Sequence, residues 1–165
     1  MISANVIIIS VAGRLEEIYR AAYEVDFADS FTIRWLLRLR GISSENFSLR
    51  GIERSIFRKL GENPGGELVF GLIGGFCTIF GDLEAIRSTP DFCEFQKPGC
   101  AKAVWNFSII EEGDKSRLTT EIRIRWLDEA SRLKFGRYWA LIRPFSGLIR
   151  MEMLKFIKRK AEVVL

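Results

Sequence analysis

The sequence predicts an α+β domain in which a strongly twisted antiparallel sheet wraps one long C-terminal helix. Residues 101–111 and 117–127 alternate apolar and polar side chains on either side of a turn sequence, as two paired strands do. From Asp128 to about Ala161, apolar residues recur at intervals of three, four or seven, which is typical of a helix. Two shorter helical patterns lie between the first predicted strand and the other strands, and this order indicates an α+β fold.

Gly13 separates the first predicted strand from the first predicted helix. Residues 2–10 are rich in β-branched side chains, and the unbroken apolar run within them predicts a buried strand. After Gly13, the residues Ile18, Ala22 and Val25 recur at helical intervals while charged residues fill the other positions. We therefore expect an amphipathic helix of about three turns at this point.

A second helix is predicted between the candidate N-cap residues Asp29 and Ser30 and the helix-breaking Gly41. Side chains that follow one another four residues apart are neighbours on one face of a helix. The apolar residues that this spacing places together are Phe31, Trp35 and Leu39, with Leu36 beside them. Residues 41–49 are expected to form a loop.

Residues 50–61 allow two interpretations. Their apolar residues have helical spacing, whereas the tight-turn sequence Asn-Pro-Gly-Gly at 63–66 favours a hairpin. We expect residues 55–61 to pair with residues 67–73, and the choice between strand and helix for 55–61 stays open. After Gly74 and Gly75 an apolar run resumes at 76–80, and prolines bracket a short predicted strand at 92–95.

The two clearest strands each place their large apolar residues on one face, which indicates a sheet with one buried and one wet side. Asp128 is the expected N-cap of the long helix. Pro144, with Gly147 beside it, predicts a kink in the middle of that helix, because proline lacks the backbone donor and clashes with the preceding turn. In the two clearest strands, the face with the large apolar residues holds Ala103, Trp105, Phe107 and Ile109 in the first strand and Leu118, Thr120, Ile122, Ile124 and Trp126 in the second.

Composition indicates a single domain over residues 1–165 that can bury its own core. Three widely spaced cysteines do not form a disulfide framework, so we expect reduced thiols in a cytoplasmic protein, with Cys77 and Cys93 as small core residues. The apolar N-terminal residues are too short for a membrane span and lack the basic start of a signal peptide.

Several kinds of chemistry are excluded by the residues themselves. Histidine is absent, so neither a Ser-His-Asp nor a Cys-His arrangement can form, and a tetrahedral zinc site lacks its usual ligands. No phosphate-binding glycine pattern is present, and Gly71, Gly74 and Gly75 favour a bend in a curling strand instead. Glu121 falls on the polar face of its strand, where a cross-strand arginine is its expected partner. We predict no catalytic residue, metal or cofactor.

The order of elements, and five segments within them, resemble the SRPBCC superfamily, which includes START, birch-pollen-allergen and polyketide cyclase-like proteins. The resemblance covers nearly the whole chain and is closest to a branch of small proteins that has no established catalytic residues. It implies a helix-grip fold with a hydrophobic cavity between the sheet and the long helix. The segments are ELVFGL at 67–72, AKAVWNF at 101–107, LTTEIR at 118–123, FGRYW at 135–139 and IRPFSGLIR at 142–150.

Strand parity and this resemblance together predict the residues that face the cavity. Polar contacts could come from Thr120 or Tyr138, whereas parity puts Asn106 and Ser108 on the outer face; Arg143 is either a carboxylate contact or a surface residue. A filled core is the alternative to an open cavity, because protein interiors are close-packed. The predicted ligand-binding residues are Phe70, Leu72, Phe76, Phe80, Trp105, Phe107, Ile109, Thr120, Ile122, Ile124, Trp126, Tyr138, Trp139, Ile142 and Phe145.

The expected partner is a small hydrophobic molecule such as a lipid, fatty acid or polyketide-like compound. Two alternatives are a cyclase or aromatase that uses the same cavity and an interaction module without a ligand. The net charge of +4 is a mild excess, and the basic residues are spread along the chain, so we expect no nucleic-acid partner. Residues 145–164 mix apolar residues with Arg150 and several lysines, so this helix either contacts an anionic membrane surface or packs on its own sheet with snorkelling lysines. The sequence does not define an oligomeric state.

Overall fold

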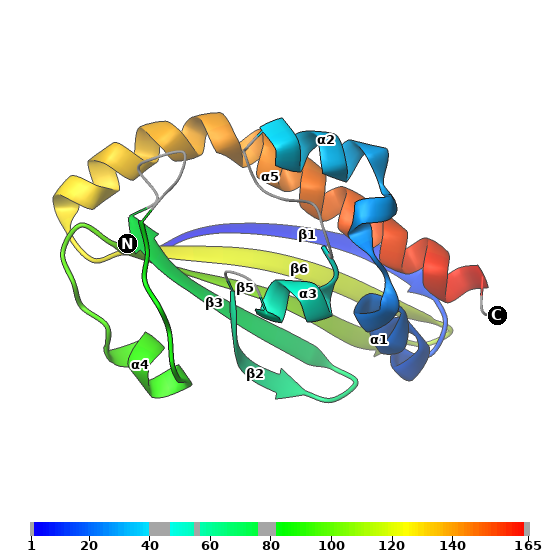
Figure 1. The fold of residues 1–165 in the computed structure, drawn as a ribbon. Helices are drawn as coiled ribbons and strands as arrows, with labels where there is room; N and C mark the ends of the chain where they lie inside the picture. Colours follow the sequence, from blue (N-terminus) through cyan, green and yellow to red (C-terminus); the bar gives the residue numbers. More distant parts are fainter. Residues whose placement is uncertain (1, 40–46, 55–56, 76–81, 164–165) are drawn as a thin grey trace.

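The computed structural model describes residues 2–39, 47–54, 57–75 and 82–163, which form an α+β fold (Figure 1). The chain begins with β1 (Ile2–Ala12), α1 (Leu15–Glu24), the 3₁₀ helix η1 (Phe27–Asp29), α2 (Phe31–Leu39) and α3 (Leu49–Arg54). It continues with β2 (Arg58–Asn63), β3 (Glu67–Gly75), β4 (Asp82–Leu83), α4 (Thr89–Glu94), β5 (Ala101–Glu112), β6 (Lys115–Trp126) and α5 (Glu129–Val163).

The strands form one antiparallel sheet in the order β1-β6-β5-β3-β2, with the short β4 paired to β3. The long helix α5 crosses one face of this curved sheet, and α1, α2 and α3 lie on the same side (Figure 1). We call this the inner face. The predicted fold class, a curved antiparallel sheet around a long C-terminal helix with short helices after the first strand, is confirmed.

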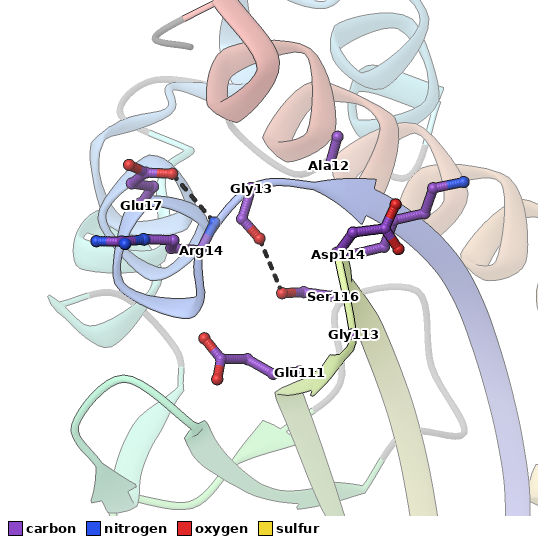
Figure 2. A pocket seen from close by; sticks show the side chains of 9 residues that line it. Ala12, Gly13, Arg14, Glu17, Glu111, Gly113, Asp114 and Ser116 are labelled. Atoms are coloured by element: carbon purple, nitrogen blue, oxygen red, sulfur yellow. Dashed lines mark hydrogen bonds between the residues drawn. The ribbon is translucent and has the colours of Figure 1, made fainter.

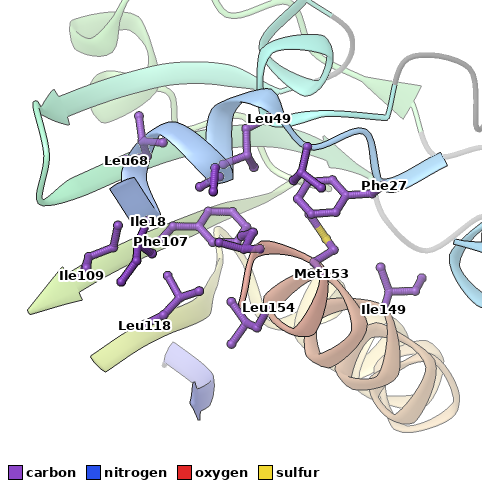
Figure 3. Close-up of a cluster of buried hydrophobic side chains, with 14 of the residues drawn as sticks. Ile18, Phe27, Leu49, Leu68, Phe107, Ile109, Leu118, Ile149, Met153 and Leu154 are labelled. Atoms are coloured by element: carbon purple, nitrogen blue, oxygen red, sulfur yellow. The ribbon is translucent and has the colours of Figure 1, made fainter. Parts of the chain in front are cut away.

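The main core lies between the inner face and the helices. Phe107 of β5, Leu118 of β6 and Ile18 of α1 meet Met153 and Leu154 of α5, and all five side chains are buried. Figure 3 shows these side chains converging from the sheet and the helices. Burial of large apolar side chains on this scale is the main force that holds α5 against the sheet.

Strand β1 is an edge strand, so the prediction that it is buried is wrong for one of its faces. Val6 and Ile8 are 49% and 54% exposed. Ile7 and Ile9 point the other way and pack against the main core. The apolar run hides the alternation, because both faces of the strand carry β-branched residues.

Of the apolar group predicted on helix α2, Leu36 is buried, whereas the face that Phe31 and Trp35 form is exposed. Ile33, Leu36 and Leu37 are buried, whereas Phe31 and Trp35 are 74% and 55% exposed. The predicted cap is confirmed, because the backbone N–H of Ile33 donates to Ser30 Oγ at 3.3 Å. Asp29, the other candidate cap, belongs to η1.

The prediction of a strand at 92–95 is wrong, because residues 89–94 form helix α4. Ser88 caps this helix by accepting from the backbone N–H of Asp91 at 3.2 Å, and Pro90 stands in the first turn, where its missing donor costs nothing. The helix places Phe92 on the outer face of the sheet, next to Ile73. It also leaves Cys93 exposed, which corrects the prediction that Cys93 is a core residue; Cys77 lies outside the described residues.

Both interpretations of residues 50–61 are right in part. Helix α3 ends at Arg54, and β2 then pairs with β3 through the predicted turn, so the hairpin is confirmed. In that turn Gly65 has a φ of +82°, a conformation that favours glycine. Gly71 is needed for space rather than for a bend, because a Cβ there would lie 2.5 Å from Cδ1 of Leu60 and 2.9 Å from the ring of Phe92. The predicted run at 76–80 lies outside the described residues.

Helix α5 begins after Asp128, as predicted. The Asp128 carboxylate accepts from the backbone N–H of Ser131 at 2.8 Å and from its hydroxyl at 2.6 Å, and it also accepts from the backbone N–H of Gly99 at 2.6 Å. These donors lower the pKa of Asp128 to about 2. The helix continues through Pro144, and its ribbon bends in the middle (Figure 1), where the sequence predicts a kink.

Candidate ligand-binding interior

Most of the described residues that were predicted to bind a ligand lie on the inner face, beneath α5. Trp105, Phe107 and Ile109 of β5 are buried there, as is Phe70 of β3. They pack in the main core with Met153 of α5. Side chains from the strands and from α5 therefore share one apolar interior, as the sequence predicts.

Trp105 is at the centre of an aromatic group in this interior. Its ring centroid lies 5.0 Å from that of Phe107, 5.4 Å from that of Phe57 and 6.4 Å from that of Phe70. Its indole Nε1 donates to the Thr120 hydroxyl at 2.8 Å, and that hydroxyl donates to the backbone carbonyl of Asn106 at 3.0 Å. Thr120 therefore fixes the orientation of Trp105, and its hydroxyl proton is already engaged.

A second group of rings is formed between β6, which supplies Trp126, and the first half of α5, which supplies Phe135 and Trp139. Phe135 stacks on Trp139 with ring centroids 5.7 Å apart and meets Trp126 edge-on at 5.8 Å. Ile124 of β6 packs against these rings, and Ile122 contacts both this group and the main core. The two groups are thus joined along the inner face of β6.

Two indole nitrogens in the second group have no hydrogen-bond partner among the described residues. Nε1 of Trp126 and Nε1 of Trp139 are both buried, and neither donates to an acceptor in that part of the chain. Buried donors of this kind are rare, because an unpaired polar group loses its hydration without compensation. Both N–H groups can therefore donate to an acceptor that enters the interior.

Arg150 of α5 is buried in the interior, although its basic neighbours in the sequence suggest a surface helix. Its side chain is 1% exposed. Nη1 donates to the backbone carbonyl of Asn5 at 2.9 Å and Nε donates to that of Ser146 at 3.3 Å, whereas no described residue accepts a hydrogen bond from Nη2. Burial lowers the pKa of Arg150 to about 10, so it stays protonated at neutral pH. The feature of the sequence that indicates this burial is the position of Arg150 between the buried residues Ile149 and Met153.

The remaining predicted site residues differ in how far the structure describes them. Leu72 is buried on β3, and Phe145 is partly buried against the main core. Tyr138 and Ile142 belong to α5, but their side chains lie outside the description, as do Phe76 and Phe80. The contact of these residues with a ligand stays a prediction.

Several polar residues that the sequence singled out lie away from the interior. Asn106 is on the outer face, as predicted, and donates to Glu67 at 2.9 Å. Glu121 does accept from an arginine, but Arg123 is on the same strand, not a neighbouring one, and the two bonds are 2.8 Å and 2.6 Å long. Arg143 is exposed, so a surface position is the correct alternative for it.

A surface pocket of about 390 Å³ lies at the end of the sheet, where the β5–β6 turn meets the connection from β1 to α1 (Figure 2). Its polar groups are largely engaged in local structure. Glu17 accepts from the backbone N–H of Arg14 at 3.1 Å, and Ser116 donates to the carbonyl of Gly13 at 3.0 Å. Charged side chains line part of this pocket and the rest of its surface is mostly apolar, but it lies at the end of the sheet and outside the aromatic interior.

A cluster of titratable residues ties β2 to α1. The hydroxyls of Tyr19 and Tyr23 both donate to Oε1 of Glu62, and Lys59 Nζ donates to its Oε2 at 3.0 Å. Burial and the bond to Glu62 raise the pKa of both phenols, while the bonds from Tyr19 and Lys59 lower the pKa of Glu62. The carboxylate is thereby held as an anion by its donors, which is a structural role.

Within the described residues, no group of three histidine, cysteine, aspartate or glutamate side chains is placed to hold a metal ion. In the same part of the chain, no helix combines the length and apolar character needed to cross a membrane. Two lysines of α5 have contacts within the protein: Lys155 pairs with Glu152 at 2.8 Å, and Lys158 donates to the carbonyl of Ser10 at 2.9 Å.

A curved antiparallel sheet closed by a long C-terminal helix is the helix-grip arrangement, and this chain is a helix-grip protein by its own geometry. No protein-family model matches the chain, and no curated protein matches it. Among solved structures it is similar to TTHA0849 from Thermus thermophilus, with 8% identity, 98% of this chain and 99% of that chain covered, and a TM-score of 0.41.

Two other solved structures are similar at comparable levels. CalU16 from Micromonospora echinospora is 16% identical, with 97% of this chain and 84% of that chain covered and a TM-score of 0.37. StfQ, a di-domain ARO/CYC from the steffimycin biosynthetic pathway, is 14% identical, with 98% of this chain covered and a TM-score of 0.41. The chain spans about half of StfQ, at 52% of its length.

Proposed function

We propose that this protein binds a small hydrophobic molecule between the inner face of the sheet and α5. The observation that carries the proposal is the pair of buried indole nitrogens of Trp126 and Trp139, which lie among apolar rings and find no acceptor in the described part of the chain. Ligand sites are mostly apolar with a few polar groups that fix orientation, and this interior has that composition. A ligand with an apolar body and an oxygen acceptor would pair these donors.

Binding is favoured over catalysis by the side chains of the interior. A cyclase or aromatase needs a hydroxyl or ionisable group that can exchange a proton with its substrate. Thr120, a predicted inner residue, donates its proton to the backbone and accepts from Trp105. Arg150 is protonated at neutral pH and holds its proton too strongly to serve as a base.

Native mass spectrometry of the purified protein, together with thermal unfolding across a panel of lipids, fatty acids and aromatic polyketide-like compounds, tests this proposal. We expect a bound species of one ligand per chain and a rise in melting temperature with at least one compound, because a ligand that binds only the folded state stabilises it. A protein that purifies without ligand and gains no stability from any member of the panel would count against the proposal.

A further inference from the structure

Arg150 is a buried cation that no acidic side chain among the described residues pairs with. Among the side chains that the structure describes, Lys102 is the other buried cation, and it lies on the outer face, where it donates to the carbonyl of Cys93 and contacts the ring of Phe92. Arg150 instead faces the region between α5 and β1. No ion pair to Arg150 is formed by any described residue.

The contacts of Arg150 leave its charge uncompensated. Both of its acceptors, the carbonyls of Asn5 and Ser146, are neutral backbone groups. A guanidinium carries five N–H donors in a planar fork that matches a carboxylate with two parallel hydrogen bonds. A buried charge is costly unless an opposite charge pairs with it, and Nη2 is buried with no acceptor from the residues that the structure describes.

The position of Arg150 relates it to the aromatic interior. Asn5, which accepts from Nη1, stands directly opposite Ile122 in the β1–β6 pair. Ile122 is the residue that contacts both groups of the interior. The Arg150 guanidinium is therefore held at β1, the strand next to β6, and a ligand that extends from β6 towards β1 could reach it.

The buried side-chain polar atoms without partners are all donors in the described part of the chain. They are Nε1 of Trp126, Nε1 of Trp139 and Nη2 of Arg150. A molecule that completes this interior must supply acceptors, and next to Arg150 the acceptor should carry a negative charge. One cation matches one negative charge, which favours a carboxylate over a phosphate monoester, because a phosphate monoester is close to a dianion at neutral pH.

We propose that Arg150 binds the carboxylate of an amphipathic ligand whose apolar tail lies along the aromatic inner face. The ligand class is a long-chain carboxylic acid. This inference rests on the proposed function, because the tail requires the apolar interior. It adds to that function a charged headgroup site, and it assigns Arg150 as the residue that selects acids over neutral molecules of the same length.

Another role for Arg150 would be to tie α5 to β1, and the structure offers a matched control for that role. Lys158 also projects from α5 and donates to a backbone carbonyl of β1, that of Ser10, at 2.9 Å. Lys158 is partly exposed and has Glu162 at 3.7 Å as a counter-ion. The variants Arg150→Met and Lys158→Met each remove one such link, but only the first removes a buried unpaired charge.

The test measures binding of dodecanoate, dodecanol and dodecyl phosphate to the wild-type protein, Arg150→Met, Arg150→Lys and Lys158→Met by isothermal titration calorimetry. We expect the wild-type protein to bind dodecanoate about tenfold or more tighter than dodecanol, as one charge-assisted hydrogen-bonded pair provides. Arg150→Met should lose that preference while its affinity for dodecanol is unchanged. Arg150→Lys should retain part of the preference and Lys158→Met all of it.

The possible outcomes separate this inference from the proposed function. Wild-type protein that binds dodecanol but shows no preference for dodecanoate overturns the headgroup site and leaves hydrophobic binding intact. Equal affinity of Arg150→Met and wild-type protein for dodecanoate does the same. Tighter binding of dodecyl phosphate than of dodecanoate contradicts the choice of a carboxylate, and failure of all three probes to bind overturns both proposals.

Thermal unfolding of the unliganded proteins distinguishes a binding role from a structural one, and it remains informative if one variant folds poorly. An arginine kept for a ligand makes Arg150→Met at least as stable as the wild-type protein, because the cost of a buried unpaired charge disappears. Loss of stability in Arg150→Met well beyond that in Lys158→Met would show that Arg150 is a structural link and would overturn the inference. Arg150→Gln, which removes the charge but keeps a donor for the Asn5 carbonyl, is the second variant and is measured in the same way if Arg150→Met folds poorly.

Discussion

The indole nitrogen of Trp105 donates a 2.8 Å hydrogen bond to the hydroxyl of Thr120 on the neighbouring strand. Both residues are buried, and the Thr120 hydroxyl in turn donates to the carbonyl of Asn106. The largest aromatic residue of the main core is thereby fixed by a polar contact between β5 and β6.

Replacement of Thr120 by valine should reduce stability, because the shape is kept while the Trp105 N–H loses its acceptor. We expect the free energy of unfolding to fall by about 1–3 kcal/mol, the cost of an unpaired buried polar group. Urea denaturation measures this change. Thr119→Val on the outer face of the same strand is the control, and equal effects of the two substitutions would contradict the role assigned to Thr120.

Replacement of Gly71 by alanine should also destabilise the protein, because the new Cβ would overlap the side chains of Leu60 and Phe92. Overpacking of this kind costs about 1–3 kcal/mol. Gly61 in the paired strand is the matched control, since a Cβ there meets nothing within 4 Å. A Gly71→Ala variant as stable in urea as Gly61→Ala would show that this packing is not tight.

The orientation of α2 makes a third prediction. Leu36→Ala should lower the free energy of unfolding by about 2–5 kcal/mol, because it removes a buried leucine. Trp35→Ser should change it by less than about 0.5 kcal/mol, because that side chain faces solvent. The opposite ranking in chemical denaturation would contradict the observed orientation of α2, in which Leu36 is buried and Trp35 faces solvent.

The cap of α5 predicts a dependence of stability on pH. The pKa of Asp128 is about 2 in the folded protein, below the value near 3.9 expected in an unfolded chain. A lowered pKa means that the stabilisation is complete above about pH 4 and is lost as the pH falls towards 2. The stability difference between the wild-type protein and Asp128→Ala should therefore be largest at neutral pH and shrink in acid. A stability difference between the wild-type protein and Asp128→Ala that is constant with pH would refute this account of the cap.

The sheet and the long helix could be predicted because their patterns admit one interpretation. In β5 and β6, the alternation that includes Trp105 and Trp126 separates the inner face from the outer one, and each strand has a polar side. The cap at Asp128 and the proline at 144 likewise fix the start of α5 and the place of its bend.

The predictions from the sequence are wrong where one segment fits two structural patterns. Helix α2 is apolar at Phe31 and Trp35 and also at Ile33 and Leu36, so spacing alone does not choose the buried side. Arg34, which lies beside Phe31 and Trp35 on the helix surface, is the signal that favours the observed orientation. At residues 92–95, the cap formed by Ser88 and the proline after it outweighed the β-like composition.

The buried arginine could not be predicted from composition, because Arg150 resembles its basic neighbours until the helix is placed on β1. Its position on the apolar stripe was the available sign. The missing partners of Trp126 and Trp139 likewise depend on how the rings pack and not on their order in the chain. Burial of a polar atom is a property of the packed structure, and sequence spacing alone does not reveal it.

Quenching of tryptophan fluorescence by a brominated dodecanoate tests the central claim most directly. The measurement uses the variant Trp35→Phe, which lacks the exposed tryptophan, so that the emission comes from the buried Trp105 and the partly buried Trp126 and Trp139. A hydrophobic acid bound between the sheet and α5 should quench this emission in a saturable manner, at one molecule per chain. Emission that does not respond to the brominated acid, or that falls only in proportion to its bulk concentration, would contradict a ligand site in this interior.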